Sequence, residues 1–121
     1  MVVKKCNKCG ALIKVLKDCE CSNCGFKCCD EEMFKVEPNV VEASLEKHLP
    51  TYNIVDDKIV VKVNHVMEEE HYIEWIVYEC DNNEQIVYFK PGEEATATFK
   101  YSKGAIIYSY CNKHSLWSVK V

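Results

Sequence analysis

From about residue 53 to its end, the chain alternates short apolar runs with short polar segments. The apolar runs are rich in Val, Ile, Thr, Tyr and Phe, and one of them, Tyr-Ile-Glu-Trp-Ile-Val-Tyr at 72–78, partly alternates apolar with polar positions. Runs of β-branched and aromatic residues that are bounded by turn residues are typical of strands. We therefore expect strands over residues 58–64, 72–78, 85–90, 95–101, 105–110 and 116–121.

Three groups of turn-forming residues separate these strands: Asp-Asn-Asn at 81–83, Pro-Gly-Glu-Glu at 91–94 and Ser-Lys-Gly at 102–104. The segments between them lack the 3.6-residue apolar period of a helix. Short strands at this spacing predict a mainly β protein, with an antiparallel β-sandwich over residues 37–121. Residues 37–45 read as a connector at its start.

The first 36 residues have a different character. Seven of the nine cysteines lie within the first 29 residues, where aromatic residues are scarce. A segment this short cannot bury a self-sufficient core, so a bound metal must supply much of its stability. We expect residues 1–36 to form a small cysteine-rich metal-binding module ahead of the sandwich.

Composition and charge limit the expected cellular location and the classes of binding partner. The start of the chain has no apolar core of a secretory signal, and no apolar run is long enough to cross a bilayer. A cytoplasmic protein without membrane contact is expected, and in that reducing setting clustered cysteines are more often metal ligands than disulfides. The net charge of −4, with lysine as the only strongly basic residue type, offers no support for nucleic-acid binding.

The four histidines and one distant cysteine carry the clearest chemical signal. His48, His65, His71 and His114 each lie where the pattern predicts a loop or strand end, and Cys111 precedes His114 by three residues. A single histidine in such a place is usually structural or solvated. Four imidazoles with one thiolate, however, suit a five-coordinate site for a redox-active transition metal such as iron.

Three segments carry a resemblance to a known family: Glu-Lys-His-Leu-Pro at 46–50, the stretch from His65 to Trp75, and Tyr-Cys-Asn-Lys-His at 110–114. In that order they closely resemble the superoxide reductases, the desulfoferrodoxins and neelaredoxins. The resemblance implies an immunoglobulin-like seven-stranded sandwich. It also implies a catalytic iron with four equatorial imidazoles, an axial thiolate from Cys111, and an open position opposite the thiolate.

The same resemblance assigns roles beside the iron. Lys47 matches a catalytic lysine that attracts superoxide and donates a hydrogen bond at the iron, and Glu46 matches a glutamate that closes onto ferric iron after product leaves. The chain departs from the family at Val66, in the acidic run 68–70, and at Lys113. The acidic run is expected to weaken the long-range attraction of superoxide, and Lys113 adds a cation near the site.

The N-terminal cysteines allow two arrangements. Cys6-Asn-Lys-Cys9 has the spacing of a metal knuckle, and the pair Cys28 and Cys29 resembles the adjacent cysteines of a desulforedoxin module. We favour those four sulfurs as ligands. The rival is a second knuckle, Cys21 with Cys24, which together with Cys6 and Cys9 would resemble a rubredoxin or zinc ribbon. Four sulfurs suit either iron or zinc. Cys80 is expected to be a packed thiol without a ligand role.

The resemblance implies a superoxide reductase that reduces superoxide to hydrogen peroxide and is itself reduced by a small electron donor such as rubredoxin. It also implies a homodimer, with the N-terminal site as an electron relay or a structural element. Two alternatives remain at this point. One is a non-catalytic iron or zinc electron-transfer or metal-binding protein on the same fold, and the other is a zinc-ribbon interaction module.

Overall fold

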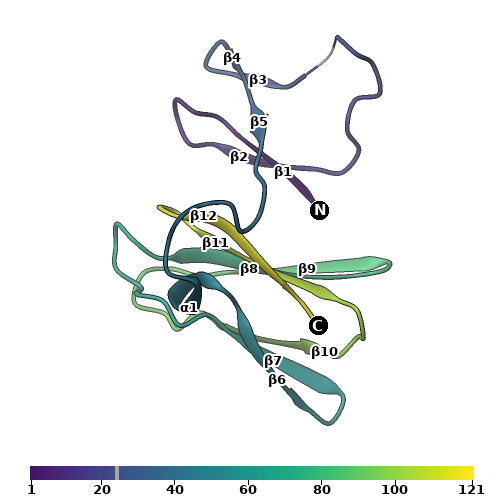
Figure 1. Cartoon of the computed structure of the whole chain (residues 1–121), viewed down its shortest axis with the longest axis vertical. Coiled ribbons are helices and arrows are strands. Elements are labelled where there is room, and N and C mark those ends of the chain that lie inside the picture. The colour runs from purple at the N-terminus through teal and green to yellow at the C-terminus, as the bar shows by residue number, and fades with distance from the viewer. Residues whose placement is uncertain (24) are drawn as a thin grey trace. The chain divides into compact units, whose positions relative to one another are not determined.

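The computed structural model describes residues 1–23 and 25–121, which divide into two compact units, Met1–Glu37 and Pro38–Val121 (Figure 1). The larger unit is a sandwich of two antiparallel sheets. One sheet has the order β10-β7-β6 and the other the order β12-β11-β8-β9. The strands are β6 (Thr51–Val55), β7 (Lys58–Lys62), β8 (Ile73–Cys80), β9 (Asn83–Tyr88), β10 (Thr96–Lys100), β11 (Ile106–Cys111) and β12 (Ser115–Lys120).

The predicted β-sandwich is therefore confirmed, with differences in detail. β6 was not among the expected strands, the first of which was placed at residues 58–64, and β8 continues to Cys80. The segment of residues 45–48 was predicted to be a loop, but it forms the short helix α1 (Leu45–His48), closed by a hydrogen bond of 2.9 Å from the Leu49 N–H to the Leu45 carbonyl. A single turn is too short to show a helical period in the sequence. Within the described chain, no helix has the length and apolar character to span a bilayer.

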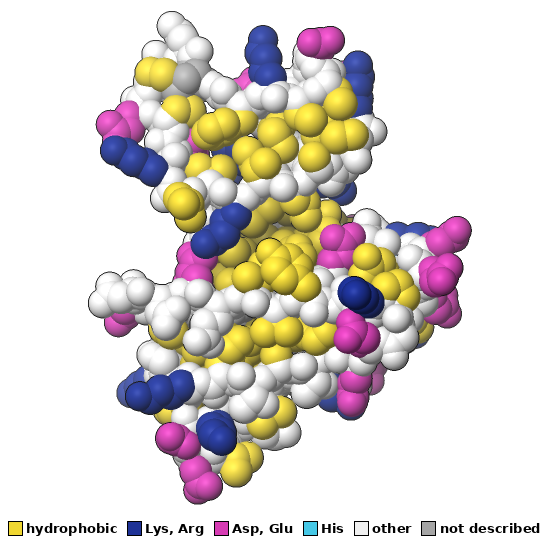
Figure 2. Space-filling view, turned by 180° about the vertical axis from the view of Figure 1, so that it is seen from behind, with side chains coloured by type: hydrophobic (Ala, Val, Ile, Leu, Met, Phe, Trp, Pro, Cys, Tyr) yellow, Lys and Arg dark blue, Asp and Glu magenta, His cyan; other side chains and the backbone are white. Residues whose placement is uncertain are grey.

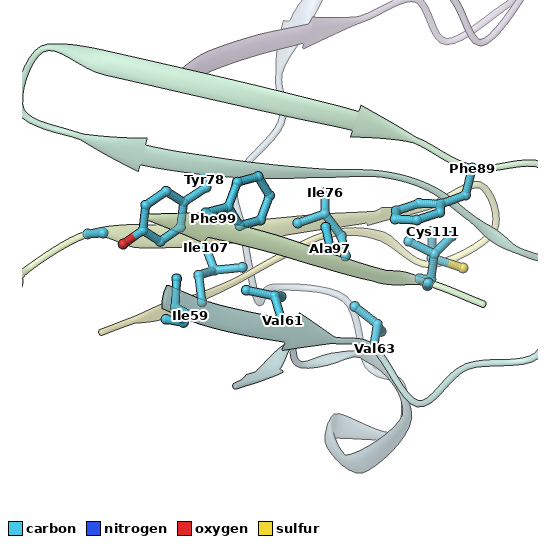
Figure 3. Close-up of a cluster of buried hydrophobic side chains, with 13 residues drawn as sticks. Ile59, Val61, Val63, Ile76, Tyr78, Phe89, Ala97, Phe99, Ile107 and Cys111 are labelled. Atoms are coloured by element: carbon cyan, nitrogen blue, oxygen red, sulfur yellow. The ribbon is translucent and has the colours of Figure 1, made fainter. Parts of the chain in front are cut away.

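The core of the sandwich lies between the two inner faces (Figure 3). Ile59, Val61, Ile73, Ile76 and Ile107 are fully buried there. Cys111 belongs to the same cluster and lies with Phe89 at one end of it, away from Tyr78 and Phe99 (Figure 3). The single cysteine among the predicted iron ligands is thus part of the hydrophobic core. The packing of that core determines where its sulfur lies.

Tyr78 anchors the other end of the core. Its ring stacks on Phe99, with centroids 4.9 Å apart and planes 7° apart. Its hydroxyl oxygen accepts a hydrogen bond of 2.8 Å from the Ser102 N–H and donates one of 3.3 Å to the Ser102 carbonyl. A buried hydroxyl that satisfies both backbone groups of one residue holds the β10–β11 turn against the sheet.

The smaller unit is built from very short strands. β1 (Val2–Lys5), β2 (Leu12–Val15) and β5 (Phe34–Lys35) form a sheet of order β2-β1-β5, and β3 (Lys27–Cys28) pairs with β4 (Glu31–Glu32). Among its described residues, the buried apolar side chains are Val3, Cys6, Met33 and Val36. So small a cluster gives limited hydrophobic stabilisation.

Lysine and acidic side chains are interspersed on the surface in the view of Figure 2. One exposed ion pair, between Lys62 Nζ and Glu94, has a separation of 2.7 Å. Exposed pairs of this kind contribute little to stability, on the order of 1 kcal/mol or less. Hydrophobic packing and backbone hydrogen bonds therefore determine the fold.

The Tyr78 hydroxyl provides a test of this account. Tyr78→Phe removes the acceptor of the half-buried Ser102 N–H, and we expect the free energy of unfolding to fall by about 1–3 kcal/mol. Urea denaturation measures this change. Tyr88→Phe is the matched control, because Tyr88 is 71% exposed and loss of its hydroxyl should leave stability unchanged. Equal stability of the two variants would contradict the anchoring role.

Candidate metal centres

Five side chains from distant parts of the larger unit converge on one point. His48 ends α1, His65 follows β7, His71 precedes β8, Cys111 ends β11, and His114 lies in the β11–β12 loop. One potential ligand atom from each lies within 4.8 Å of all the others. The structure therefore brings together the complete set of predicted iron ligands.

Neighbouring ring nitrogens of the four histidines lie at similar distances from one another. His48 Nε2 lies 3.0 Å from His114 Nδ1 and 3.2 Å from His65 Nε2, and His71 Nε2 lies 3.3 Å from His114 Nδ1. Nitrogens bound at right angles to one ion, each about 2.1 Å from it, are roughly 3 Å apart. The ring centroids of His65 and His71 are 4.6 Å apart, which closes the circuit of four imidazoles. The donors thus fit a single transition-metal ion.

The sulfur of Cys111 lies beside this circuit. It is 3.4 Å from His65 Nε2 and 3.8 Å from His114 Nδ1. Cys111 is fully buried, and burial raises the pKa of its thiol, while hydrogen bonds from the Lys113 and His114 backbone N–H groups act in the opposite direction. A cation among the donors would favour the thiolate, so metal binding should release the thiol proton.

Two histidines are oriented through their other ring nitrogen. His48 Nδ1 donates a hydrogen bond of 2.7 Å to the Ser44 carbonyl, and His65 Nδ1 donates one of 2.5 Å to the Val66 carbonyl. A carbonyl oxygen can only accept, so each Nδ1 carries the proton and each Nε2 presents a lone pair to the site. Burial also lowers the pKa of His48, His65 and His71, which favours the neutral imidazole that a metal requires.

His48 is held by its surroundings as well. Its ring stacks on Trp117, with centroids 5.0 Å apart and planes 23° apart, and its carbonyl accepts a 3.1 Å hydrogen bond from the Ser109 hydroxyl. Trp117 Nε1 donates a 2.9 Å hydrogen bond to the His114 carbonyl. Trp117 is fully buried, and it contacts one donor residue by stacking and another by hydrogen bonding. Its position three residues after His114 was the signal for the second contact.

The predicted catalytic pair lies on α1. Glu46 and Lys47 are both exposed, and Lys47 immediately precedes His48. The positive charge of Lys47 is one of the influences that lower the pKa of His48, after burial and the charge of His114. Lys113 acts on His71 in the same way, while Glu68 raises the pKa of that histidine. Lys113 and the acidic run at 68–70 therefore act electrostatically on the site through the charges of Lys113 and Glu68.

A second group of donors lies in the smaller unit: Cys6, Cys9, Cys28 and Cys29. The sulfur of Cys28 is 3.6 Å from that of Cys9 and 3.9 Å from that of Cys29. Cys29 and the following Asp30 have φ angles of 53° and 61°. Two successive left-handed residues are costly outside glycine, and here they accompany the convergence of two adjacent cysteines on one group.

The close packing of the four sulfurs also shifts the pKa values of these thiols. Backbone hydrogen bonding, chiefly from Cys9, lowers the pKa of Cys6 to about 7. Interactions with the sulfurs of Cys9, Cys6 and Cys29 raise the pKa of Cys28 to about 12. Four thiolates this close are stable only around a cation, and four sulfurs suit iron or zinc.

The rival pair is described only in part. Cys21 is disulfide-bonded, which removes its thiolate as a ligand in this state, and Cys24 lies outside the described residues. Cys80 has a free, partly buried thiol at the end of β8.

Comparison with known proteins gives consistent matches. The family model described as Desulfoferrodoxin matches residues 40–120. The desulfoferrodoxin of Syntrophotalea carbinolica is 36% identical over 96% of this chain and 93% of that protein. A desulfoferrodoxin homolog from Archaeoglobus fulgidus is 35% identical over 97% of this chain and 94% of that protein.

Solved structures show the same fold. The superoxide reductase from Treponema pallidum superposes with a TM-score of 0.72 over 98% of both chains, at 24% identity. A superoxide reductase (1Fe-SOR) from Giardia intestinalis has a TM-score of 0.55 and 25% identity, and it covers 63% of this chain and 97% of its own.

Paired substitutions separate the two arrangements of the N-terminal cysteines. Replacing Cys28 and Cys29 by serine should empty the N-terminal site and loosen the smaller unit, because metal affinity there is largely folding free energy. Replacing Cys21 and Cys24 by serine should leave its metal in place. Metal analysis per chain of the two double variants measures this directly. Loss of metal only when Cys21 and Cys24 are replaced would favour the two-knuckle arrangement.

Proposed function

The chain belongs to the desulfoferrodoxin family, and we propose from this premise that it is a superoxide reductase. In the proposed reaction, superoxide takes up one electron and two protons to give hydrogen peroxide. An external one-electron donor then restores the reduced protein. The likeness of this chain to the superoxide reductase from Giardia intestinalis supports this assignment.

The observation that carries the proposal is the convergence of four imidazoles and one thiolate within 4.8 Å. This mixed nitrogen and sulfur set suits iron better than a closed structural zinc site, which takes four ligands. His48, His65, His71, His114 and Cys111 would hold the ion. Bound iron would supply the one-electron couple that the reaction requires.

The protein supplies charge and orientation at this site. Cys111 contributes a single negative charge to the donor set, so a site that holds a divalent cation remains net positive and attracts an anion. The hydrogen bonds of His48 and His65 to backbone carbonyls and the stacking of Trp117 on His48 limit rearrangement of the rings when the charge of the centre changes. Such preorganisation lowers the cost of electron transfer.

Lys47 is proposed to bring superoxide to the site. Its ammonium is exposed beside a ligand histidine, in a chain whose net charge is −4. A local cation in an acidic protein acts mainly on the rate of encounter with an anion. Glu46, its neighbour on α1, is proposed as a residue whose carboxylate could serve as a further ligand to ferric iron between turnovers.

The N-terminal cysteines are proposed to bind iron or zinc as an electron relay or a structural element. The Giardia superoxide reductase covers only 63% of this chain, a share that the sandwich unit could supply alone. This supports a reaction that needs only the site in the sandwich. A small carrier such as rubredoxin is the proposed donor, and a homodimer is the proposed assembly.

Substitution of the proposed thiolate ligand tests the assignment. Cys111→Ser should abolish reduction of superoxide and remove the thiolate-to-iron charge-transfer absorption of the oxidised protein, because serine is a poor donor to iron at neutral pH. Stopped-flow kinetics after a pulse of superoxide, with a visible spectrum, measures both. Cys80→Ser is the matched control, since Cys80 lies at the end of β8 opposite to Ile73, the residue paired with Cys111. Turnover by Cys111→Ser at the rate of the Cys80 variant would end the proposal.

A second test concerns Lys47. We expect Lys47→Ala to slow the bimolecular reaction with superoxide by up to about tenfold and to flatten its dependence on ionic strength. Iron content should not change, since Lys47 is not a ligand. Lys103→Ala removes the same charge from the exposed β10–β11 turn, at the opposite end of β11 from Cys111, and should leave rate and salt dependence as they were. Equal behaviour of the two variants would make Lys47 an ordinary surface lysine.

A further inference from the structure

We propose that Asn112 is a positioning residue that fixes His71 relative to Cys111 and His114. The inference deepens the proposed function, because it concerns the same iron site. Asn112 lies between two of the donors in sequence and contacts the loop of a third. Its side chain points to no donor atom, so its effect would pass through the backbone on either side of His71.

Three hydrogen bonds form this clasp. The Asn112 side-chain Oδ1 accepts one of 3.0 Å from the Tyr72 N–H, and Nδ2 donates one of 3.0 Å to the Glu70 carbonyl. The Asn112 backbone N–H donates a third, of 3.2 Å, to the Tyr72 carbonyl. Glu70 and Tyr72 are the two sequence neighbours of His71. One amide side chain therefore holds both peptide segments that flank this ligand.

The register of the sheet explains why a side chain is needed here. β11 pairs with β8 residue by residue as far as Tyr110 with Trp75, and then Cys111 pairs with Ile73, so that Glu74 is passed over as a bulge. Beyond Cys111 the chain turns into the β11–β12 loop. The next carbonyl of β11 is then unavailable to the Tyr72 N–H, and the Asn112 Oδ1 takes its place. Asn112 thus extends the ladder by one step, up to His71.

The local chain offers His71 less support than His48 receives. A bridge between Glu68 and His71, with hydrogen bonds of 3.0 and 3.2 Å, closes the turn that carries it. That turn contains three successive exposed glutamates, at 68–70, whose like charges repel one another. His48, by contrast, is buried against Trp117. The Asn112 clasp therefore supplies His71 with support that its own acidic turn does not provide.

The clasp also couples donors that the sequence separates. His71 Nε2 and His114 Nδ1 lie 3.3 Å apart, and Asn112 joins the two loops that carry them. Without it, the acidic turn is free to swing His71 away, and the donor set falls from five to four.

The test compares metal-binding spectra rather than activity alone. The whole chain is loaded with zinc, which has no d–d absorption, at the N-terminal site and with cobalt(II) at the sandwich site, because the d–d absorption of cobalt is more intense in four-coordinate than in five-coordinate sites. His71→Ala provides the reference spectrum for loss of this ligand. Asn112→Ala should shift the spectrum toward that reference and weaken cobalt affinity by about 10- to 100-fold, the usual effect of removing a group that orients a ligand.

Asn39 provides a matched control. Its Oδ1 accepts a 2.9 Å hydrogen bond from the Ser118 N–H and its Nδ2 donates one of 3.2 Å to the Ser118 carbonyl. Asn39→Ala thus removes the same type of side-chain clasp from an edge of the same sandwich. The melting temperature should fall in both alanine variants, but the cobalt spectrum should change only in Asn112→Ala.

Asn112→Asp distinguishes positioning from simple stability. Aspartate still accepts from the Tyr72 N–H but has no proton for the Glu70 carbonyl, so a spectrum between those of the parent and Asn112→Ala is expected. If Asn112→Ala keeps the five-coordinate spectrum and the affinity of the parent, the proposal is wrong, whatever its melting temperature. If His71→Ala itself leaves the cobalt spectrum unchanged, His71 is not a ligand and the proposed ligand set is wrong. The His71→Ala spectrum thus distinguishes an error in the ligand set from an error in the role of Asn112.

Discussion

Four imidazole nitrogens and one sulfur converge within 4.8 Å at one end of the sandwich, and electron-pair donors this close repel one another unless a cation lies among them. Packing, ring stacking and hydrogen bonds hold the donors in place. Cys111 belongs to the hydrophobic core, His48 is stacked on the buried Trp117, and Asn112 ties the loop of His71 to the adjoining hairpin. The positive charge that the site needs follows from this packing, and the site's attraction for an anion follows from that charge.

Both centres hold closely spaced electron-pair donors in place, but different parts of the structure hold them. In the sandwich, a large core determines the position of the donors, and the backbone near Cys111 departs from regular pairing by one bulge. In the smaller unit few apolar side chains are buried, and two successive left-handed residues, Cys29 and Asp30, accompany the adjacent cysteines. Strain of this kind persists only where something else holds the backbone. A metal bound by the four sulfurs is the natural source of that restraint.

Much of this arrangement could be predicted from the sequence, because strands and metal-ligand residues produce recognisable local patterns. The runs at 58–64 and 105–110 predicted β7 and β11 almost to their ends, and the spacing of Cys111 and His114 pointed to one metal. β6 gave a weaker signal, since Thr51–Val55 is short and includes a polar Asn53. Helix α1 is a single turn and has no period to detect. The bulge that passes over Glu74 and the clasp of Asn112 depend on the register between distant strands, which no local pattern encodes.

The spacing of the donors along the chain has a consequence for assembly of the protein. Cys111 and His114 are neighbours in one hairpin, but His48 and His114 are separated by 66 residues and His65 and Cys111 by 46. An unfolded chain can therefore offer a metal only fragments of this donor set. Since the five-donor site exists only once both sheets have closed, a nascent or damaged chain would bind a metal ion there weakly. Metal binding by all five donors is thus restricted to molecules that have completed folding.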